Sequence, residues 1–269
     1  MIELIERISA RVASSRRYRE VDPHLVSRFA REEAPRARNL DDAVKRVKRR
    51  LHQAVGAFEG QRVSLDAIRA AYDGSPDAPA FRDACRAALA GHASTAERAD
   101  HLEALGGVVR ATGAQSLVDL GCGLGPLALP WYGLPRSAQL TAIDVDRRAL
   151  ATVGEFLTLI GQPHEVREQD LVADPSTPAG DLALLFKLVT TLDRQDAGAA
   201  ERVIRGLDTP RAIVSFPARS LGSRRRLDRA YRERMDELLK ALGSRVQDAT
   251  EASVPNELVY VLTLAPADG

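Results

Sequence analysis

The chain has 269 residues, of which 45% are hydrophobic and 28% are charged, a composition typical of a folded globular protein. Its length allows one α/β domain with a smaller companion. The two cysteines, Cys85 and Cys122, lie 37 positions apart, which excludes a disulfide framework and a Cys-x-x-Cys metal site. No apolar run reaches the roughly 20 residues that span a bilayer, so the chain is expected to be soluble and cytoplasmic.

The net charge of +1 conceals two basic regions. Residues 7–50 contain 14 Lys and Arg against 6 Asp and Glu, and residues 219–234 contain 7 Arg against 2 acids. The rest of the chain must therefore be net acidic. Basic residues concentrated in this way favour a polyanionic partner, such as a nucleic acid, more than the overall charge suggests.

The first 105 residues are expected to form helices only. Apolar residues recur at helical spacing between Ile2 and Val12. Asp22 followed by Pro23 predicts an N-cap with proline at the first helical position, opening a helix to about Glu33. No strand pattern occurs here, so residues 1–105 are predicted to form a helical domain. Because this domain contains the basic residues 7–50, it is also the predicted RNA-binding domain. Three more helices are expected: one capped by Asp41 or Asp42, one over residues 64–72 and one over residues 78–89.

From residue 115 onward, short β-branched and aliphatic runs alternate with helical stretches, as expected of parallel strands joined by crossover helices. The last two runs are only three residues apart and predict an antiparallel hairpin. We therefore predict an α/β fold for residues 106–269: a Rossmann-like, mostly parallel sheet that ends in an antiparallel hairpin, as in class I methyltransferases. Strands are expected over residues 116–120, 139–143, 165–169, 182–188, 212–216, 245–253 and 257–264, and helices over 147–160, 195–207 and 223–242.

A glycine run follows the first expected strand. Gly121, Gly123 and Gly125 come directly after the strand that ends near Asp119, and glycines at such a turn let the backbone approach a ligand closely. Pro126 stands where the dinucleotide fingerprint has a glycine or alanine, and it shortens the following helix. A cofactor anchored by phosphates at a helix N-terminus fits such a shortened helix poorly. The run favours a nucleoside cofactor without phosphates; the alternative is a tight structural turn.

Two further carboxylates end expected strands. Asp144 is placed to accept hydrogen bonds from both ribose hydroxyls of a nucleoside cofactor. Asp170 could accept one from an adenine amino group, and the backbone N–H of Leu171 could face an adenine ring nitrogen. Each aspartate could instead serve as a helix N-cap. The five histidines are scattered without metal-ligand spacing, and no Gly-x-Ser-x-Gly elbow occurs, so neither a metal site nor hydrolysis is predicted.

Several segments, in order along nearly the whole chain, carry a resemblance to a known family. The most specific are His92-Ala-Ser-Thr-Ala-Glu-Arg98 and Ser215-Phe-Pro-Ala-Arg-Ser-Leu-Gly222. The others are residues 15–18, 45–52 with 56–58, 119–124, 130–135, 143–146, 184–187 and 256–260. Together they resemble the aminoglycoside-resistance 16S rRNA guanine-N7 methyltransferases, the family that contains the Sgm, ArmA and RmtB enzymes.

The resemblance implies an S-adenosylmethionine-dependent enzyme that methylates N7 of a guanosine in the decoding site (helix 44) of 16S rRNA. Its partner would be the 30S subunit, and the methylation would confer aminoglycoside resistance. The enzyme would act as a monomer. Arg98 would pair with the methionine carboxylate of the cofactor, a bidentate task that suits a guanidinium. The region of Gly121 would receive the methionine amino group.

The resemblance also implies sets of binding residues. Lys187 would position the target nucleotide. The cofactor would be held by Arg98, Asp119, Gly121, Gly123, Asp144, Asp170 and Leu171. The rRNA phosphates would be bound by Arg16, Arg17, Lys45, Arg46, Lys48, Arg49, Arg50, Arg219, Arg224, Arg225 and Arg226.

The chain departs from the family beside the expected acceptor pocket. After Lys187 it has Leu188-Val-Thr-Thr-Leu-Asp-Arg-Gln195 in place of the family's usual segment. The target base therefore stays open, and methylation of another rRNA base, such as adenine at N1, is an alternative. A small-molecule methyltransferase is a second alternative, although it would not need the basic residues 7–50. A non-enzymatic RNA-binding protein is the third.

Overall fold

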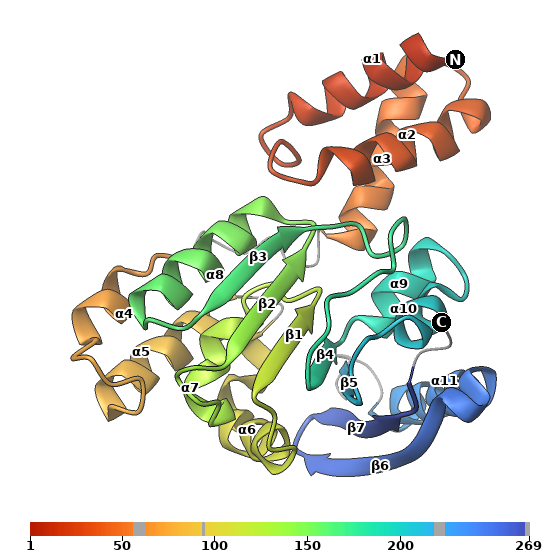
Figure 1. Cartoon of the computed structure of the whole chain (residues 1–269). Helices are drawn as coiled ribbons and strands as arrows, with labels where there is room; N and C mark the ends of the chain where they lie inside the picture. The colour runs from red at the N-terminus through yellow and green to blue at the C-terminus, as the bar shows by residue number, and fades with distance from the viewer. Residues whose placement is uncertain (56–62, 93–94, 218–223, 267–269) are drawn as a thin grey trace.

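The computed structural model describes residues 1–55, 63–92, 95–217 and 224–266, and the side chains of residues 224–228 are not described. Three helices at the N-terminus, α1 (Ile2–Ala13), α2 (Pro23–Glu33) and α3 (Leu40–Ala54), form a bundle beside the rest of the molecule (Figure 1). The short 3-10 turn η1 (Ala34–Arg36) links the second to the third. Their inward side chains, among them Phe29 and Leu51, form a hydrophobic core of their own.

The helix starts in this bundle follow from local capping. Asp22 caps α2, since its Oδ1 accepts a hydrogen bond from the His24 backbone N–H at 2.7 Å, as predicted. The prediction that Asp41 or Asp42 caps α3 is wrong. Asn39 is the cap, its Oδ1 accepting from the Asp42 N–H at 2.9 Å. Both aspartates lie in the first turn, where a negative charge stabilises the amino end of a helix.

The next helices belong to the core of the sheet. They are α4 (Asp66–Ala71), α5 (Pro79–Ala90), the 3-10 helix η3 (Ala96–His101) and α6 (Leu102–Ala111). Phe81 of α5 and Leu105 of α6 share one hydrophobic core with sheet residues such as Leu140. Among the described residues, the change from one core to the next falls between Val55 and Leu65. The division of the chain at residue 105 stays a prediction.

Seven strands form one sheet in the order β3-β2-β1-β4-β5-β7-β6. The first five pair in parallel, β7 pairs antiparallel with β5, and β6 pairs antiparallel with β7. The predicted α/β fold, a mostly parallel sheet closed by an antiparallel hairpin, is confirmed. The strands are β1 (Ser116–Leu120), β2 (Gln139–Asp144), β3 (His164–Glu168), β4 (Leu182–Phe186), β5 (Arg211–Pro217), β6 (Val246–Val254) and β7 (Glu257–Leu264).

Alternate residues of each buried strand face opposite layers of helices. In β1, Leu117 packs on one side with α4 to α8, and Val118 packs on the other with α9 to α11. The predicted helix over residues 195–207 is wrong in its bounds, because two short helices, α9 and α10, replace it on either side of Gly198 (φ +79°). The connecting helices are η4 (Gly125–Ala128), α7 (Leu129–Tyr132), α8 (Arg147–Leu159), α9 (Val189–Gln195), α10 (Ala199–Arg205), α11 (Arg224–Leu242) and η5 (Gly243–Arg245).

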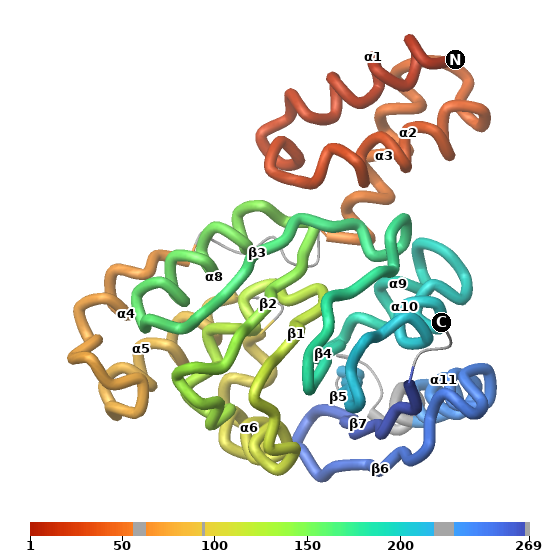
Figure 2. Tube along the Cα trace, in the orientation of Figure 1, coloured from red at the N-terminus to blue at the C-terminus, as the bar shows by residue number. Residues whose placement is uncertain are grey.

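Two links join the N-terminal bundle to the sheet. The segment before α2 runs beside the end of β2, where the Asp22 N–H donates to the Val145 carbonyl at 2.9 Å and the Arg147 N–H donates to the Glu20 carbonyl at 3.0 Å. The trace in Figure 2 also brings the end of α3 down to α9, with which it is in contact. Within the described part of the chain, no helix is long and apolar enough to cross a membrane.

The packing of α6 on α7 gives a test of the fold. A Cβ added to Gly106 would lie 2.2 Å from the Trp131 carbonyl oxygen, a backbone atom that cannot move aside. We expect Gly106→Ala to lower the free energy of unfolding by about 1–3 kcal/mol, the usual range for overpacking. The neighbouring Gly107→Ala is the control: its nearest contact is the flexible end of Arg110 at 3.8 Å, so the better helix propensity of alanine should leave stability equal or higher. Urea denaturation of both variants measures this. Equal stability of the two would contradict the close packing.

Candidate functional site

A cavity of about 440 Å³ opens at the carboxyl ends of the parallel strands. It lies where the strand order reverses, with β1 between β2 and β4, which is where ligands bind in open α/β sheets. The cavity is lined by the glycine loop after β1, by Asp144 at the end of β2, by Asp170 after β3 and by Lys187 after β4. Residues of the N-terminal bundle, including Arg16 and Arg17, also line it. The cavity is therefore shared between the sheet and the bundle.

The glycine loop has a backbone shape that other residues rarely adopt. Gly121 and Gly123 have φ of +60° and +48°. A side chain at Gly121 would also meet Leu188, whose Cδ1 would lie 2.6 Å from the added Cβ. The loop is followed only by the short η4 and α7, as Pro126 and Pro130 predict. The glycines therefore bring bare backbone to the cavity wall.

Asp144 holds this loop and the start of α8 in place. Its Oδ2 accepts from the Gly123 N–H and its Oδ1 from the Asp146 N–H, both at 2.8 Å. Removal from water raises the pKa of the Asp144 carboxyl to about 6, against the lowering effect of these two hydrogen bonds. Asp146 is the N-cap of α8, accepting from the Arg148 and Ala149 N–H groups. The helix cap is therefore Asp146, whereas Asp144, for which a cap was the alternative, faces the cavity.

Asp119, in β1, is an isolated buried carboxylate. The residue is 2% exposed, and its Oδ2 has no hydrogen-bond partner among the described residues. Burial raises the pKa of this carboxyl to about 7, with Arg98 opposing and Asp144 reinforcing the shift. A Cβ on Gly125 would lie 3.1 Å from Oδ2, so Asp119 packs behind the glycine run and does not itself line the cavity. An unsatisfied carboxylate of this kind is costly unless a cation compensates it.

Arg98 and Glu257 form a buried ion pair at the cavity. The Arg98 Nε and Nη2 donate to the two Glu257 oxygens at 2.8 and 3.1 Å, and the side chains are 5% and 1% exposed. Burial by itself would raise the pKa of Glu257, but the charge and hydrogen bonds of Arg98 outweigh it and hold that pKa below its ordinary value. The pair uses Nε and Nη2, so Nη1 lies outside it. Arg98 is buried, so it does not form a surface ion pair with its chain neighbours Glu97 or Asp100.

Lys187 lies at the same edge. It has a φ of +57°, unusual for a side chain of this size, and its backbone N–H donates to the Ser215 carbonyl at 3.0 Å. Its Nζ donates to Glu97 at 3.0 Å and lies 3.9 Å from Glu257. Lys187, Glu257 and Arg98 therefore form one line of alternating charge across the ends of β4 and β7.

Asp170 and Leu171 come from the loop after β3, and both line the cavity. Arg28 of α2 binds the Asp170 carboxylate with two hydrogen bonds, Nε to Oδ2 at 2.6 Å and Nη2 to Oδ1 at 3.1 Å. Arg28 and Glu257 are the two site residues that sequence reasoning missed. Glu257 falls within residues 256–260, one of the family-like segments, but no local pattern distinguishes Arg28 from its basic neighbours.

Six of the seven predicted cofactor residues line the cavity, and Asp119 is the exception. The predicted phosphate-binding residues are more dispersed. Arg46 and Arg50 are engaged within the protein, Arg46 through its Nε by Glu33 at 2.7 Å and Arg50 by Glu32. Arg219 lies outside the described residues, as do the side chains of Arg224, Arg225 and Arg226. Arg16, Arg17, Lys45 and Arg49 are exposed, and Lys48 is half-buried.

Comparison with known proteins gives a consistent result over the whole chain. Residues 14–261 match the family described as ribosomal RNA methyltransferase (FmrO). A 16S rRNA (guanine(1405)-N(7))-methyltransferase of Micromonospora echinospora is 35% identical over 267 residues, 96% of each chain. A protein of the same name from Frankia casuarinae is 35% identical over 272 residues, 97% of this chain and 94% of that one.

Solved structures agree with these relatives. The crystal structure of the 16S rRNA methyltransferase RmtF in complex with S-adenosyl-L-homocysteine superposes with a TM-score of 0.81 at 30% identity, covering 98% of this chain and 100% of that chain. The 16S rRNA methylase RmtB superposes with a TM-score of 0.75 at 28% identity, covering 97% and 98%.

The raised pKa of Asp119 predicts how stability varies with pH. With a folded pKa of about 7 against an ordinary 3.8, this carboxyl holds a proton in the folded protein that the unfolded chain has released. Its contribution to stability is complete below about pH 4 and is lost as the pH rises through 7. Asp119→Asn cannot ionise, so its unfolding free energy relative to the wild type should increase between pH 5 and pH 8.

Urea denaturation at the two pH values measures this difference. The exposed Asp83 supplies the control, since Asp83→Asn should differ from the wild type by the same amount at both. A difference for Asp119→Asn that does not change with pH would refute the buried, unpaired carboxylate.

Proposed function

Because this chain belongs to the FmrO family of ribosomal RNA methyltransferases, we propose that it transfers the methyl group of S-adenosylmethionine to N7 of a guanosine in the decoding site of 16S rRNA. The substrate would be the assembled 30S subunit, and the enzyme would act as a monomer. By its resemblance to the aminoglycoside-resistance methyltransferases, this modification would confer aminoglycoside resistance. The observation that carries the proposal is the single cavity that Arg98, Asp144, Asp170 and the glycine loop share.

The side chains around this cavity fit an adenosyl amino acid. Asp144 offers a carboxylate to ribose hydroxyls, and Asp170 with Leu171 offers an acceptor and a donor to adenine. The Nη1 of Arg98 lies outside its pair with Glu257 and suits a carboxylate. Asp119, whose Oδ2 has no partner among the described residues, supplies negative charge behind the glycine run for an ammonium group. The cofactor would supply an electrophilic methyl group on a sulfonium sulfur.

The reaction requires little of the protein beyond positioning the guanosine and the cofactor. Guanine N7 carries a lone pair and no proton, so the new N–C bond forms without a general base. The electron pair of the broken C–S bond stays on sulfur, and the positive charge passes to the purine. Holding the reactants in line can supply ~7–11 kcal/mol of the barrier. Lys187, at the cavity edge, is the residue we propose to orient the guanosine.

Access to N7 requires the guanosine to leave its helix. N7 faces the major groove, which in A-form RNA is too deep and narrow for side chains. We infer that the nucleotide is flipped out at a cost of a few kcal/mol, offset by phosphate contacts. Arg16 and Arg17 support this arrangement because they are exposed and also line the cofactor cavity. Lys45 and Arg49 of α3 extend the basic surface of the same bundle. Arg46 and Arg50, held by acidic neighbours, would support that surface instead of binding phosphate.

Transfer of a labelled methyl group to 30S subunits tests the proposed function. We expect incorporation with the wild type, and at least a tenfold loss of cofactor affinity in Asp144→Ala, because a hydrogen bond to a charged group contributes about 1.5–3 kcal/mol. Asp83→Ala, which removes an exposed carboxylate of α5, is the matched control and should retain activity. Absence of labelled rRNA with the wild type, despite cofactor binding measured by calorimetry, would sink the proposal.

A charge reversal on α3 tests the docking surface. Arg49→Glu should weaken binding to 30S subunits and lower the slope of log affinity against log salt by about one, since each phosphate contact releases ~0.7–0.9 counterions. Cofactor affinity should not change. Lys240→Glu makes the same change of charge at an exposed position near the end of α11, and should leave the salt slope as it is. Binding that is insensitive to Arg49→Glu would show that α3 does not meet the RNA.

A further inference from the structure

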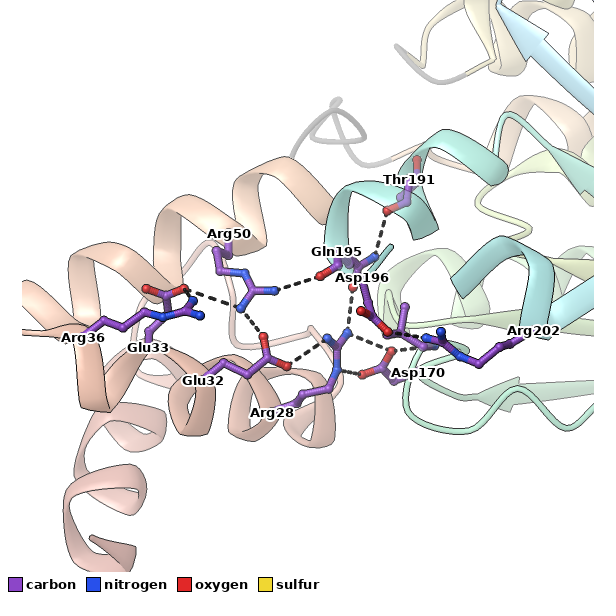
Figure 3. Close-up of polar contacts among 11 residues, drawn as sticks. Arg28, Glu32, Glu33, Arg36, Arg50, Asp170, Thr191, Gln195, Asp196 and Arg202 are labelled. Atoms are coloured by element: carbon purple, nitrogen blue, oxygen red, sulfur yellow. Dashed lines mark hydrogen bonds and ion pairs between the residues drawn. The ribbon is translucent and has the colours of Figure 1, made fainter. Parts of the chain in front are cut away.

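A polar network connects the N-terminal bundle to the wall of the cofactor cavity (Figure 3). Arg28 and Glu32 come from α2 and Arg50 from α3, while Asp170 and Gln195 come from the sheet side of the junction. Figure 3 shows Arg28 between Glu32 on one side and Asp170 with Gln195 on the other. Apolar neighbours of the two halves pack in different hydrophobic cores, Phe29 and Leu51 in one and Leu171 in the other. These contacts therefore bridge parts of the chain that pack separately.

All three nitrogens of the Arg28 guanidinium are engaged. Nε and Nη2 donate to the Asp170 carboxylate at 2.6 and 3.1 Å. Nη2 also donates to Gln195 Oε1 at 2.7 Å, and Nη1 donates to Glu32 at 3.4 Å. The Arg28 side chain is 11% exposed and Asp170 is 4% exposed. A buried, two-bond pair of this kind fixes the plane and direction of the carboxylate.

The Asp170 carboxylate retains room for one more donor. A carboxylate can accept about four hydrogen bonds. Two come from Arg28 and one from the Val172 N–H to Oδ1 at 3.1 Å. The remaining position is on Oδ2, and Asp170 lines the cofactor cavity. Arg28 does not line that cavity; it lines a second one of about 620 Å³ with Glu32, Arg50 and Gln195. Arg28 thus acts on the site through residues that line it, Asp170 by two hydrogen bonds and Gln195 by one.

We propose that Arg28 is a positioning residue of the cofactor site: it directs Asp170 Oδ2 at the amino group of adenine, so that recognition of the base depends on a helix of the N-terminal bundle. This inference rests on the proposed function, which assigns the adenine to Asp170. Loss of Arg28 would leave a buried carboxylate with one donor instead of three, and such a group turns toward water or other partners. Adenine would then lose a directed acceptor.

The N-terminal bundle also contacts Arg28, on the side away from Asp170. Arg50 pairs with Glu32, which in turn contacts Arg28, and the Arg50 Nη2 donates to the Gln195 carbonyl at 3.2 Å. The guanidinium groups of Arg28 and Arg50 lie 4.7 and 4.1 Å from the centre of the buried Phe29 ring. The position of Arg28 is therefore set by the packing of α2 against α3, the helix that also carries Lys45 and Arg49.

The readout is selectivity for the base of the ligand, because replacing a residue with a merely structural role would not change that selectivity. We would compare, by calorimetry on the full chain, the affinities for S-adenosyl-L-homocysteine and S-inosyl-L-homocysteine, whose base has an oxygen acceptor in place of the amino donor. The wild type should prefer the adenine compound by about tenfold or more, because the inosine compound sets an acceptor against a buried carboxylate. In Arg28→Met the preference should fall to about twofold or less. The exposed Arg31 of the same helix gives the matched control, and Arg31→Met should keep the wild-type preference.

Two further variants make every outcome decisive. Arg28→Lys keeps the charge but cannot donate two parallel bonds, so it should also lose most of the preference, and it replaces Arg28→Met if that variant does not fold. Wild-type preference in either folded Arg28 variant would overturn the inference.

Asp170→Asn separates this failure from that of the cofactor site. If Asp170→Asn loses the preference while the Arg28 variants keep it, the site stands and the inference falls; if Asp170→Asn also keeps it, Asp170 does not read adenine.

Discussion

The buried ion pair between Arg98 and Glu257 is the interaction on which the rest of the site depends. The two residues are 159 positions apart in the chain, one in η3 before the sheet and the other at the start of its last antiparallel pairing. A buried guanidinium without a partner would be strongly destabilising. The pair therefore fixes the 3-10 helix against β7, and with Lys187 it balances charge across the sheet edge. What it leaves unbalanced is Asp119, a buried carboxylate with no hydrogen-bond partner on Oδ2 in the described part of the chain.

This distribution of charge favours one kind of ligand. The Arg98 side suits a carboxylate, and the Asp119 side suits an ammonium, so the zwitterionic end of an amino acid complements both. Asp144, held by the Gly123 and Asp146 N–H groups, faces the middle of the same cavity. The raised pKa of Asp119 follows from the same constraint, since desolvation of the carboxyl exceeds the effect of Arg98. We therefore propose that these charges, which cost stability in the protein alone, serve to bind a charged nucleoside.

The sequence predicted those parts of the fold that depend on near neighbours. The strand, glycine turn and carboxylate between Ser116 and Asp144 follow from hydrophobic period and turn chemistry within about 30 residues, and the closing hairpin follows from the short spacer before Glu257. The cap of α3 was missed because Asn39, Asp41 and Asp42 are all good N-cap residues, and only the backbone decides among them.

Contacts between distant segments could not be predicted in this way. Arg28 and Asp170 are 142 residues apart, and nothing in the sequence of α2 distinguishes Arg28 from the exposed Arg31. The same limit applies to Arg50, which the resemblance assigned to phosphates and which Glu32 holds inside the protein. A charge run indicates a basic surface, but tertiary neighbours decide which of its members remain available to a ligand.

The most direct test is to locate the methyl group. 30S subunits would be incubated with the enzyme and S-adenosylmethionine, and the 16S rRNA would be mapped by mass spectrometry of its fragments together with strand cleavage specific for N7-methylguanine. We expect one new N7-methylguanosine, in the decoding site, and a lower yield of it with Asp144→Ala at a limiting cofactor concentration. A methyl group on adenine, or on a guanosine outside the decoding site, would contradict the proposed function.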